Sequence, residues 1–259
     1  IPLYSVGAIK PAPILMQGWL SKLKLLAGKE PDFEDYVSAI EDLFGEDEYQ
    51  KALPKVNELV VRYPDQAKAH LLRGICYHNL REYKYSVQFF NEAINLQPLD
   101  ADAHFWKGMS FLETQQEEAG FNSLDEAIRL ASPIQRTFYL LEKGKVLAVY
   151  DRTDEAISCF NSLLEEDPED VEAMYHKCLV LNEQLKWEES LALIDKALRL
   201  SPGNSMLVCT KANTLHGLKR DKEAVDILNQ AVKDDPKNEE VFWIRGGILM
   251  ENRMYKEAI

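Results

Sequence analysis

The chain has 259 residues, of which 46% are hydrophobic, and a formal net charge of −13 at pH 7. The hydrophobic content is that of a folded protein, which argues against intrinsic disorder. An acidic protein repels phosphate backbones, and no basic stripe with interleaved aromatic residues offsets this charge. The composition therefore argues against nucleic-acid binding.

The sequence lacks the common motifs of catalysis and metal binding. Its four cysteines form no CxxC pair, and no HExxH, GxGxxG or GxxxxGK[ST] pattern occurs. We therefore expect a protein that is not an enzyme, with no catalytic residue, no metal site and no cofactor. We expect a reducing compartment, the cytoplasm, in which buried reduced thiols are formed by Cys76, Cys159, Cys178 and Cys209.

The first predicted segment is a leader that covers residues 1–31. Prolines interrupt residues 1–13, and residues 14–28 follow with a helical apolar face formed by Leu15, Trp19, Leu23 and Leu26. We expect this short amphipathic helix to cap the rest of the chain. Two alternatives stay open, a basic anchor on a membrane surface and an element that docks on the chain itself or on a partner. Residues 1–29 contain four lysines and no acid, so the remaining residues carry −17.

A repeat of 34 residues organises the chain from residue 32 onward. Pro64 and Pro98 are 34 residues apart, as are Pro168, Pro202 and Pro236, whereas Pro133 falls one residue late. Numbering the proline as repeat position 32 predicts repeats at residues 33–66, 67–100, 101–134, 137–170, 171–204 and 205–238, followed by a truncated repeat at 239–259. Repeats of this length indicate stacked helical units, each unable to bury its apolar face alone.

The second repeat shows the pattern most fully, with Gly74, Tyr77, Tyr83, Ser86, Phe90, Ala93 and Pro98 at repeat positions 8, 11, 17, 20, 24, 27 and 32. This pattern resembles the tetratricopeptide repeat, a helix–turn–helix unit. The resemblance covers residues 33–259. It implies an all-α protein, an α-solenoid of stacked antiparallel helix pairs that forms a right-handed superhelix. The first helix of each repeat, helix A, then lines an inner groove, and the second helix, helix B, lies outside.

Two features depart from the family pattern. Two additional residues precede the fourth repeat, and we expect them to lengthen helix B of the third repeat or the loop near residues 131–136. Position 7, often leucine in the family, is basic in every repeat from the second onward, as Arg73, Lys107, Lys143, Lys177, Lys211 and Arg245. We expect the aliphatic stems to pack while the charges reach solvent. The alternative is a basic ladder that grips an acidic partner.

Candidate partner-binding residues follow from the helical period. Positions 2, 6, 9 and 13 of helix A point away from helix B, and position 5 lies at the edge of that face. The candidates are Leu72, Ile75, Phe105, Trp106, Met109, Phe138, Leu141, Tyr175 and Leu179. We expect Trp106, Met109, Leu72 and Phe138 to converge on one exposed apolar surface, which in a folded protein marks an interface. The alternative is that the leader or neighbouring repeats bury them.

The sequence thus predicts a protein-interaction scaffold or adaptor that binds a partner peptide or helix, amphipathic or basic, in its groove. Membrane contact is not expected. Since the last repeat is cut at Ile259, we expect the chain to belong to a longer polypeptide. Two other functions stay open, the recruiting arm of an enzyme whose catalytic domain lies outside this chain, and a membrane-associated assembly factor.

Overall fold

The computed structural model describes residues 31–251, which form thirteen α-helices and, within that range, no β-strand. Helix A of the successive repeats is α2 (Phe33–Gly45), α4 (Ala67–Asn79), α6 (Ala101–Glu113), α8 (Pro133–Val149), α10 (Val171–Glu183), α12 (Ser205–Gly217) and α14 (Glu239–Glu251). Helix B is α3 (Tyr49–Arg62), α5 (Tyr83–Leu96), α7 (Glu117–Leu130), α9 (Thr153–Glu166), α11 (Trp187–Leu200) and α13 (Asp221–Asp234). The all-α prediction is confirmed. The predicted leader helix lies outside the described residues.

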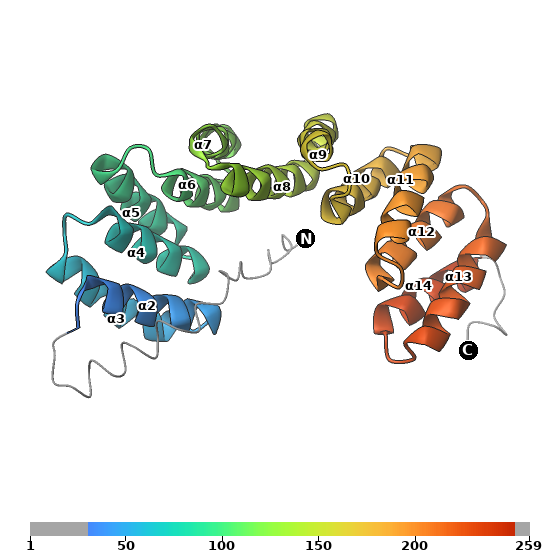
Figure 1. The fold of residues 1–259 in the computed structure, drawn as a ribbon, viewed down its shortest axis with the longest axis horizontal. Coiled ribbons are helices and arrows are strands. Elements are labelled where there is room, and N and C mark those ends of the chain that lie inside the picture. Colours follow the sequence, from blue (N-terminus) through green and yellow to red (C-terminus); the bar gives the residue numbers. More distant parts are fainter. Residues whose placement is uncertain (1–30, 252–259) are drawn as a thin grey trace. The chain divides into compact units, whose positions relative to one another are not determined.

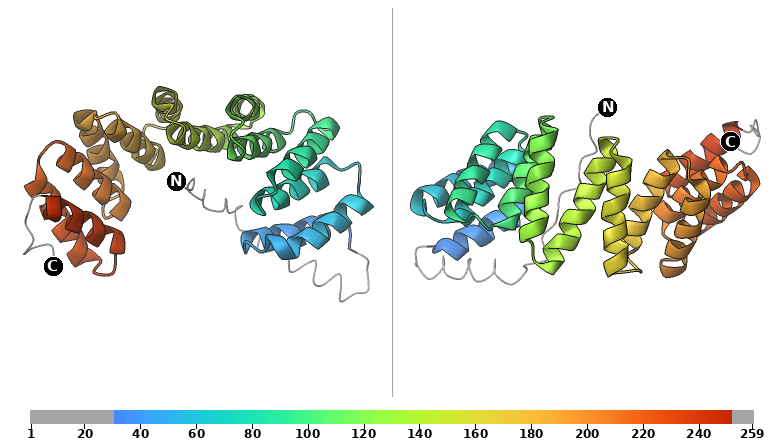
Figure 2. Two further views of the ribbon diagram at one scale, coloured as in Figure 1. Left: turned by 180° about the vertical axis from the view of Figure 1, so that it is seen from behind. Right: turned by 90° about the horizontal axis from the view of Figure 1, so that it is seen from above.

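The chain divides into two compact units, the first ending at Tyr139 and the second beginning at Leu140, with α8 crossing the boundary. In the first unit, successive helices from α2 to α7 pack on one another in antiparallel pairs, as Figure 1 shows. In the second unit, helices α9 to α14 repeat this arrangement, which Figure 2 shows from two further sides. Each unit is therefore a solenoid of stacked helix pairs, as the sequence predicts. Between residues 31 and 251, no helix has both the length and the apolar character needed to cross a membrane.

Glycine at repeat position 8 lets the two helices of a pair approach closely. A Cβ atom added to Gly74 on α4 would lie 2.3 Å from the ring of Phe90 on α5. One added to Gly144 on α8 would lie 2.7 Å from the ring of Phe160 on α9. Both phenylalanines are fully buried at position 24 of the same repeat. The sequence pattern of small and large residues is therefore the packing pattern of the helix pair.

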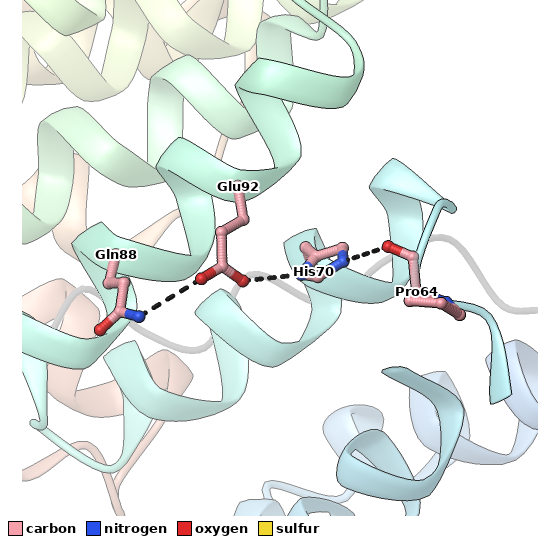
Figure 3. A network of polar contacts seen from close by, with 4 residues as sticks. All are labelled: Pro64, His70, Gln88 and Glu92. Atoms are coloured by element: carbon pink, nitrogen blue, oxygen red, sulfur yellow. Dashed lines mark hydrogen bonds and ion pairs between the residues drawn. The ribbon is translucent and has the colours of Figure 1, made fainter. Parts of the chain in front are cut away.

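The proline turn before α4 is held by a buried histidine (Figure 3). The Nε2 atom of His70 lies 2.7 Å from the carbonyl oxygen of Pro64, and its Nδ1 atom lies 2.9 Å from Oε2 of Glu92 on α5. The other carboxylate oxygen of Glu92 accepts a hydrogen bond from Gln88. One side chain thus ties the turn to both helices of the second repeat, which carry several of the candidate residues described below.

The junction between the third and fourth repeats differs from the prediction. Helix α7 has the same 14 residues as the other B helices, so it is not lengthened, and only residues 131–132 separate it from α8. Instead α8 has 17 residues, four more than the other A helices, because the two additional residues and two residues of the usual four-residue connection join its beginning. Ser132 and Gln135 cap this beginning reciprocally, through Ser132 N to Gln135 Oε1 at 3.2 Å and Gln135 N to Ser132 Oγ at 3.5 Å. Proline is favoured as the first helical residue, which explains why α8 begins at Pro133.

The basic residues at position 7 have partners that the sequence analysis missed. In the second unit, Lys177 Nζ lies 2.6 Å from Asn161 Oδ1, Lys211 Nζ 2.7 Å from Asp195 Oδ1, and Arg245 Nε 2.6 Å from Asn229 Oδ1. Each partner occupies position 25 on helix B of the preceding repeat. These three side chains are half-buried, so their charges are both partly exposed and paired within the solenoid. The sequence does contain a sign of this pairing, because position 25 is Asn or Asp in each of the first six repeats. These residues are Asn57, Asn91, Asp125, Asn161, Asp195 and Asn229.

The turn between helices A and B has the same backbone conformation in six repeats. Its middle residue has a positive φ although it is never glycine, and these residues are Asp47, Arg81, Gln115, Asp151, Leu185 and Lys219. Residues with a Cβ atom rarely adopt this left-handed conformation. The turns therefore carry local backbone strain that the packed helices on either side maintain.

Replacing the bulkiest of these residues by glycine should stabilise the protein. Leu185 has a φ of 58° and is 69% exposed, so its side chain contributes little packing. The left-handed conformation costs an ordinary residue about 1–2 kcal/mol, and Leu185→Gly should raise the free energy of unfolding in urea by about 1 kcal/mol. Asp47→Gly is the matched control and should gain less, because aspartate tolerates this conformation better. Equal or reversed effects of the two substitutions would contradict the prediction.

Candidate functional site

An apolar row crosses three helices of the first unit. Ile75 on α4 and Trp106 on α6 are both half-buried and pack against the same buried cluster. The ring centroid of Trp106 lies 5.6 Å from that of Phe105, which in turn lies 5.5 Å from that of Phe138 on α8. Phe138 is also half-buried, whereas Phe105 is buried beneath the row. We call the partly exposed side chains of Ile75, Trp106 and Phe138 the Trp106 surface.

The indole of Trp106 packs against a histidine that belongs to a polar network. The ring of His78 on α4 meets the Trp106 ring edge to face, with centroids 5.2 Å apart. The Oγ atom of Ser110 donates to the carbonyl oxygen of Trp106 at 2.9 Å, so it can accept a hydrogen bond from His78 Nδ1 at 2.8 Å. Ser86 on α5 donates to the same Ser110 oxygen at 2.7 Å. The network thus links α4, α5 and α6 next to the Trp106 ring.

His78 is a neutral part of this network at pH 7. Burial lowers the pKa of His78 to about 4, because an apolar environment disfavours the charged imidazolium. A neutral imidazole with its proton on Nδ1 satisfies the hydrogen bond to Ser110 and leaves no buried charge beneath Trp106.

Two of the predicted surface residues belong to the core. Leu72 is 1% exposed and lies in the apolar cluster with Ile40 and Val56, and Met109 is 5% exposed. The expectation that both lie on an exposed surface is wrong. The physical reason is that consecutive A helices, α2 with α4 and α4 with α6, also contact one another. Side chains that point away from helix B are therefore partly covered by a neighbouring helix A, as Leu72 is by α2.

The remaining candidates belong to the second unit. Leu141 on α8 is buried, and Tyr175 on α10 is half-buried against a core cluster that includes Met174 and Cys178. Leu179, one turn after Tyr175, is half-buried as well. The cluster that Tyr175 packs against includes Leu207 of the next repeat, so this side chain helps to pack neighbouring repeats together.

Acidic groups flank the Trp106 surface on α6. Asp102 precedes Trp106 by about one turn and accepts a hydrogen bond from the hydroxyl of Tyr139. Glu113 follows at the end of the helix and accepts one from the hydroxyl of Tyr83 at 3.2 Å. Both carboxylates are half-buried. An apolar centre with acids at either end suits a ligand with an apolar anchor and basic ends.

Comparisons with known proteins agree with the fold. The sequence matches the family model described as tetratricopeptide repeat over residues 38–98 and 141–205. The C-terminal part of a repeat protein from Cytophaga hutchinsonii is 13% identical, with a TM-score of 0.69 over 88% of this chain and 91% of that chain. PilW, a type IV pilus biogenesis factor, is 14% identical, with a TM-score of 0.67 over 82% of this chain and 98% of that chain.

YrrB, described as having an unusual peptide-binding site, is 15% identical, with a TM-score of 0.55 over 72% of this chain and 95% of that chain. At such low identities the likeness concerns the fold alone. A comparison with curated protein sequences finds no match.

Proposed function

Because the chain belongs to the tetratricopeptide repeat family, whose stacked helices generally serve as protein-interaction scaffolds, we propose that it binds a peptide segment on the Trp106 surface. The observation that carries the proposal is the half-buried indole of Trp106. It packs against the same buried cluster as Ile75, its ring contacts that of Phe105, and His78 packs against it. Phe105 in turn contacts Phe138. Tryptophan held rigidly at a partly exposed position is typical of a binding hot spot.

The chemistry of the surface defines the ligand. An apolar residue of the partner would cover the Trp106 ring, while lysine or arginine side chains would face Asp102 and Glu113 on the same helix. The proposed ligand is therefore an amphipathic segment with a large apolar anchor between basic residues. The location that we propose is the cytoplasm, in agreement with four cysteines that are buried and reduced.

The test is selection from a random peptide display library with the full chain, followed by affinity measurement of the selected peptides. We expect sequences that combine a large apolar residue with lysine or arginine. Trp106→Ala should weaken their binding by about 2 kcal/mol, roughly thirtyfold, because truncation removes a hot-spot contact.

The matched control is the same substitution at Trp243 on α14, which is 82% exposed in the second unit. Trp243→Ala should leave the affinity of the selected peptides within about twofold. Loss of binding in the control, or unchanged binding in Trp106→Ala, would overturn the proposal.

A further inference from the structure

Arg73 departs from the pattern of its counterparts at position 7. In the second unit, three of these cations bind an Asn or Asp at position 25 of the preceding repeat. The corresponding partner of Arg73 is Asn57 on α3, but Arg73 Nε and Asn57 Oδ1 are both buried without a hydrogen-bond partner. The guanidinium carbon lies instead 4.1 Å from the centroid of the Phe89 ring on α5. Arg73 thus lacks the partner that these three counterparts have, and it resembles Lys107, whose Nζ lies 5.8 Å from the centroid of the Phe111 ring.

The ring that holds Arg73 belongs to an aromatic cluster of the second repeat. Tyr77 stacks on Phe89 with centroids 5.2 Å apart, and Tyr85 lies 5.7 Å from Tyr77. Tyr85 is 52% exposed, whereas Phe89 is buried. At the corresponding positions 11, 19 and 23, the fifth repeat has Leu181, Glu189 and Leu193, and the sixth has Leu215, Glu223 and Ile227. The packing of a repeat therefore does not require aromatic residues at these positions.

The surroundings of this cluster are basic in an otherwise acidic protein. Residues 49–91 contain seven lysines and arginines against three acids, whereas the whole chain has a net charge of −13. Arg81 and Lys84 in the same repeat are exposed and form no ion pair with the residues that the structure describes. Arg73 likewise has no acidic partner in residues 31–251. Lys51, Arg62 and Lys68 are paired with Glu48, Glu58 and Glu41. The charges of Arg73, Arg81 and Lys84 therefore remain available to an incoming anion.

We propose that Arg73, Tyr77, Tyr85 and Phe89 form a second binding surface, for an acidic peptide segment. A carboxylate of the partner would bind the guanidinium of Arg73. The Phe89 ring holds this planar group in a fixed orientation, so that its N–H groups can donate two parallel hydrogen bonds to a carboxylate. The exposed ring of Tyr85 would add apolar contact beside it, a combination of residue types found in binding hot spots. Arg81 and Lys84 would attract the acidic chain over a longer range.

This surface is separate from the Trp106 surface. Arg73 and Ile75 are two residues apart on α4, so their side chains leave the helix about 200° apart. One face of α4 therefore contributes Ile75 to the apolar row, and the opposite face contributes Arg73 to the basic aromatic cluster. The two surfaces can be tested independently.

The test is fluorescence anisotropy of the full chain with a labelled peptide of glutamates around a single phenylalanine. We expect saturable binding that weakens at higher salt, since charge pairs contribute to it. Arg73→Gln and Tyr85→Ala should each weaken binding by about tenfold, and Arg73→Gln should also reduce the dependence on salt. Because Tyr85 is largely exposed, its variant should keep the fold, as checked by circular dichroism.

Two controls separate this proposal from its alternatives. Lys211→Gln changes a cation at the same repeat position that is already paired with Asp195, so it should leave the affinity within about twofold. Trp106→Ala should also leave binding of the acidic peptide unchanged, which distinguishes this surface from the Trp106 surface. The proposal is overturned by absence of peptide binding, by unchanged affinity in both Arg73→Gln and Tyr85→Ala, or by tighter binding of a single-stranded RNA than of the peptide.

Discussion

The free energy of unfolding should fall as the pH is lowered from about 6.5 to about 4, and His78→Asn should remove part of this loss. Burial lowers the pKa of His78 from 6.5 to about 4. Between these two values the unfolded chain binds a proton on this ring and the folded chain does not, so acid favours unfolding. A pKa shift of this size corresponds to a loss of about 3 kcal/mol in the free energy of unfolding. This loss is complete near pH 4 and absent at pH values above the pKa of His78 in the unfolded chain.

Asparagine is the substitution of choice because the protein already uses it at this position. Asn182 on α10 is the counterpart of His78 in the fifth repeat, and it hydrogen-bonds Thr214, the counterpart of Ser110, at 3.0 Å. Ser190 also lies 3.3 Å from Thr214, as Ser86 lies near Ser110. The His78→Asn variant should therefore fold with a stability at pH 7 within about 1 kcal/mol of the original protein.

Urea unfolding of the original protein and of the His78→Asn variant, at neutral and acidic pH, measures how much of the pH dependence of stability depends on His78. His176 provides an independent comparison, because burial and then the nearby Lys145 lower its pKa to about 4 as well. His176→Asn should reduce the pH dependence separately, and the double variant should reduce it further. If His78→Asn lost as much stability on acidification as the original protein, the His78 ring would bind its proton equally well in both states.

The sequence was sufficient to predict the helices and their pairing. A proline and small residues that recur every 34 residues specify where helices end and where they approach closely, and α4 begins at Ala67 as the second repeat requires. These signals are local, because each depends on residues within one repeat. The small residue Gly74 and the large residue Phe90 meet inside one helix pair, so their spacing alone predicts the contact.

The candidate site depends on contacts between repeats, which the period does not specify. The helical period shows that Leu72 and Met109 point away from helix B, but not that a neighbouring helix A covers them. Similarly, Lys211 and Asp195 belong to different repeats, and their pairing becomes visible only when positions 7 and 25 are compared together. The extension of α8 was missed because Ser132 and Gln135 cap a new helix beginning ahead of the repeat boundary.

Met109→Ala should lower the free energy of unfolding by about 2–5 kcal/mol, because it removes a buried side chain and leaves a cavity between helices. Met109 is 5% exposed, which makes it part of the core of the first unit. Met206 on α12 is the matched control, since it is 46% exposed. Met206→Ala should change the free energy of unfolding by less than about 0.5 kcal/mol.

Urea unfolding, together with amide hydrogen exchange of α6, measures this effect and its location. Met109→Ala should weaken peptide binding to the Trp106 surface only as far as it lowers the folded fraction, so binding should recover at lower temperature. Trp106→Ala should instead lower the affinity of the folded protein, because its indole ring is the proposed contact. A Met109→Ala protein that kept its stability but lost peptide binding would contradict this prediction. It would show that the Met109 side chain contacts the ligand and belongs to the binding surface, as the sequence analysis expected.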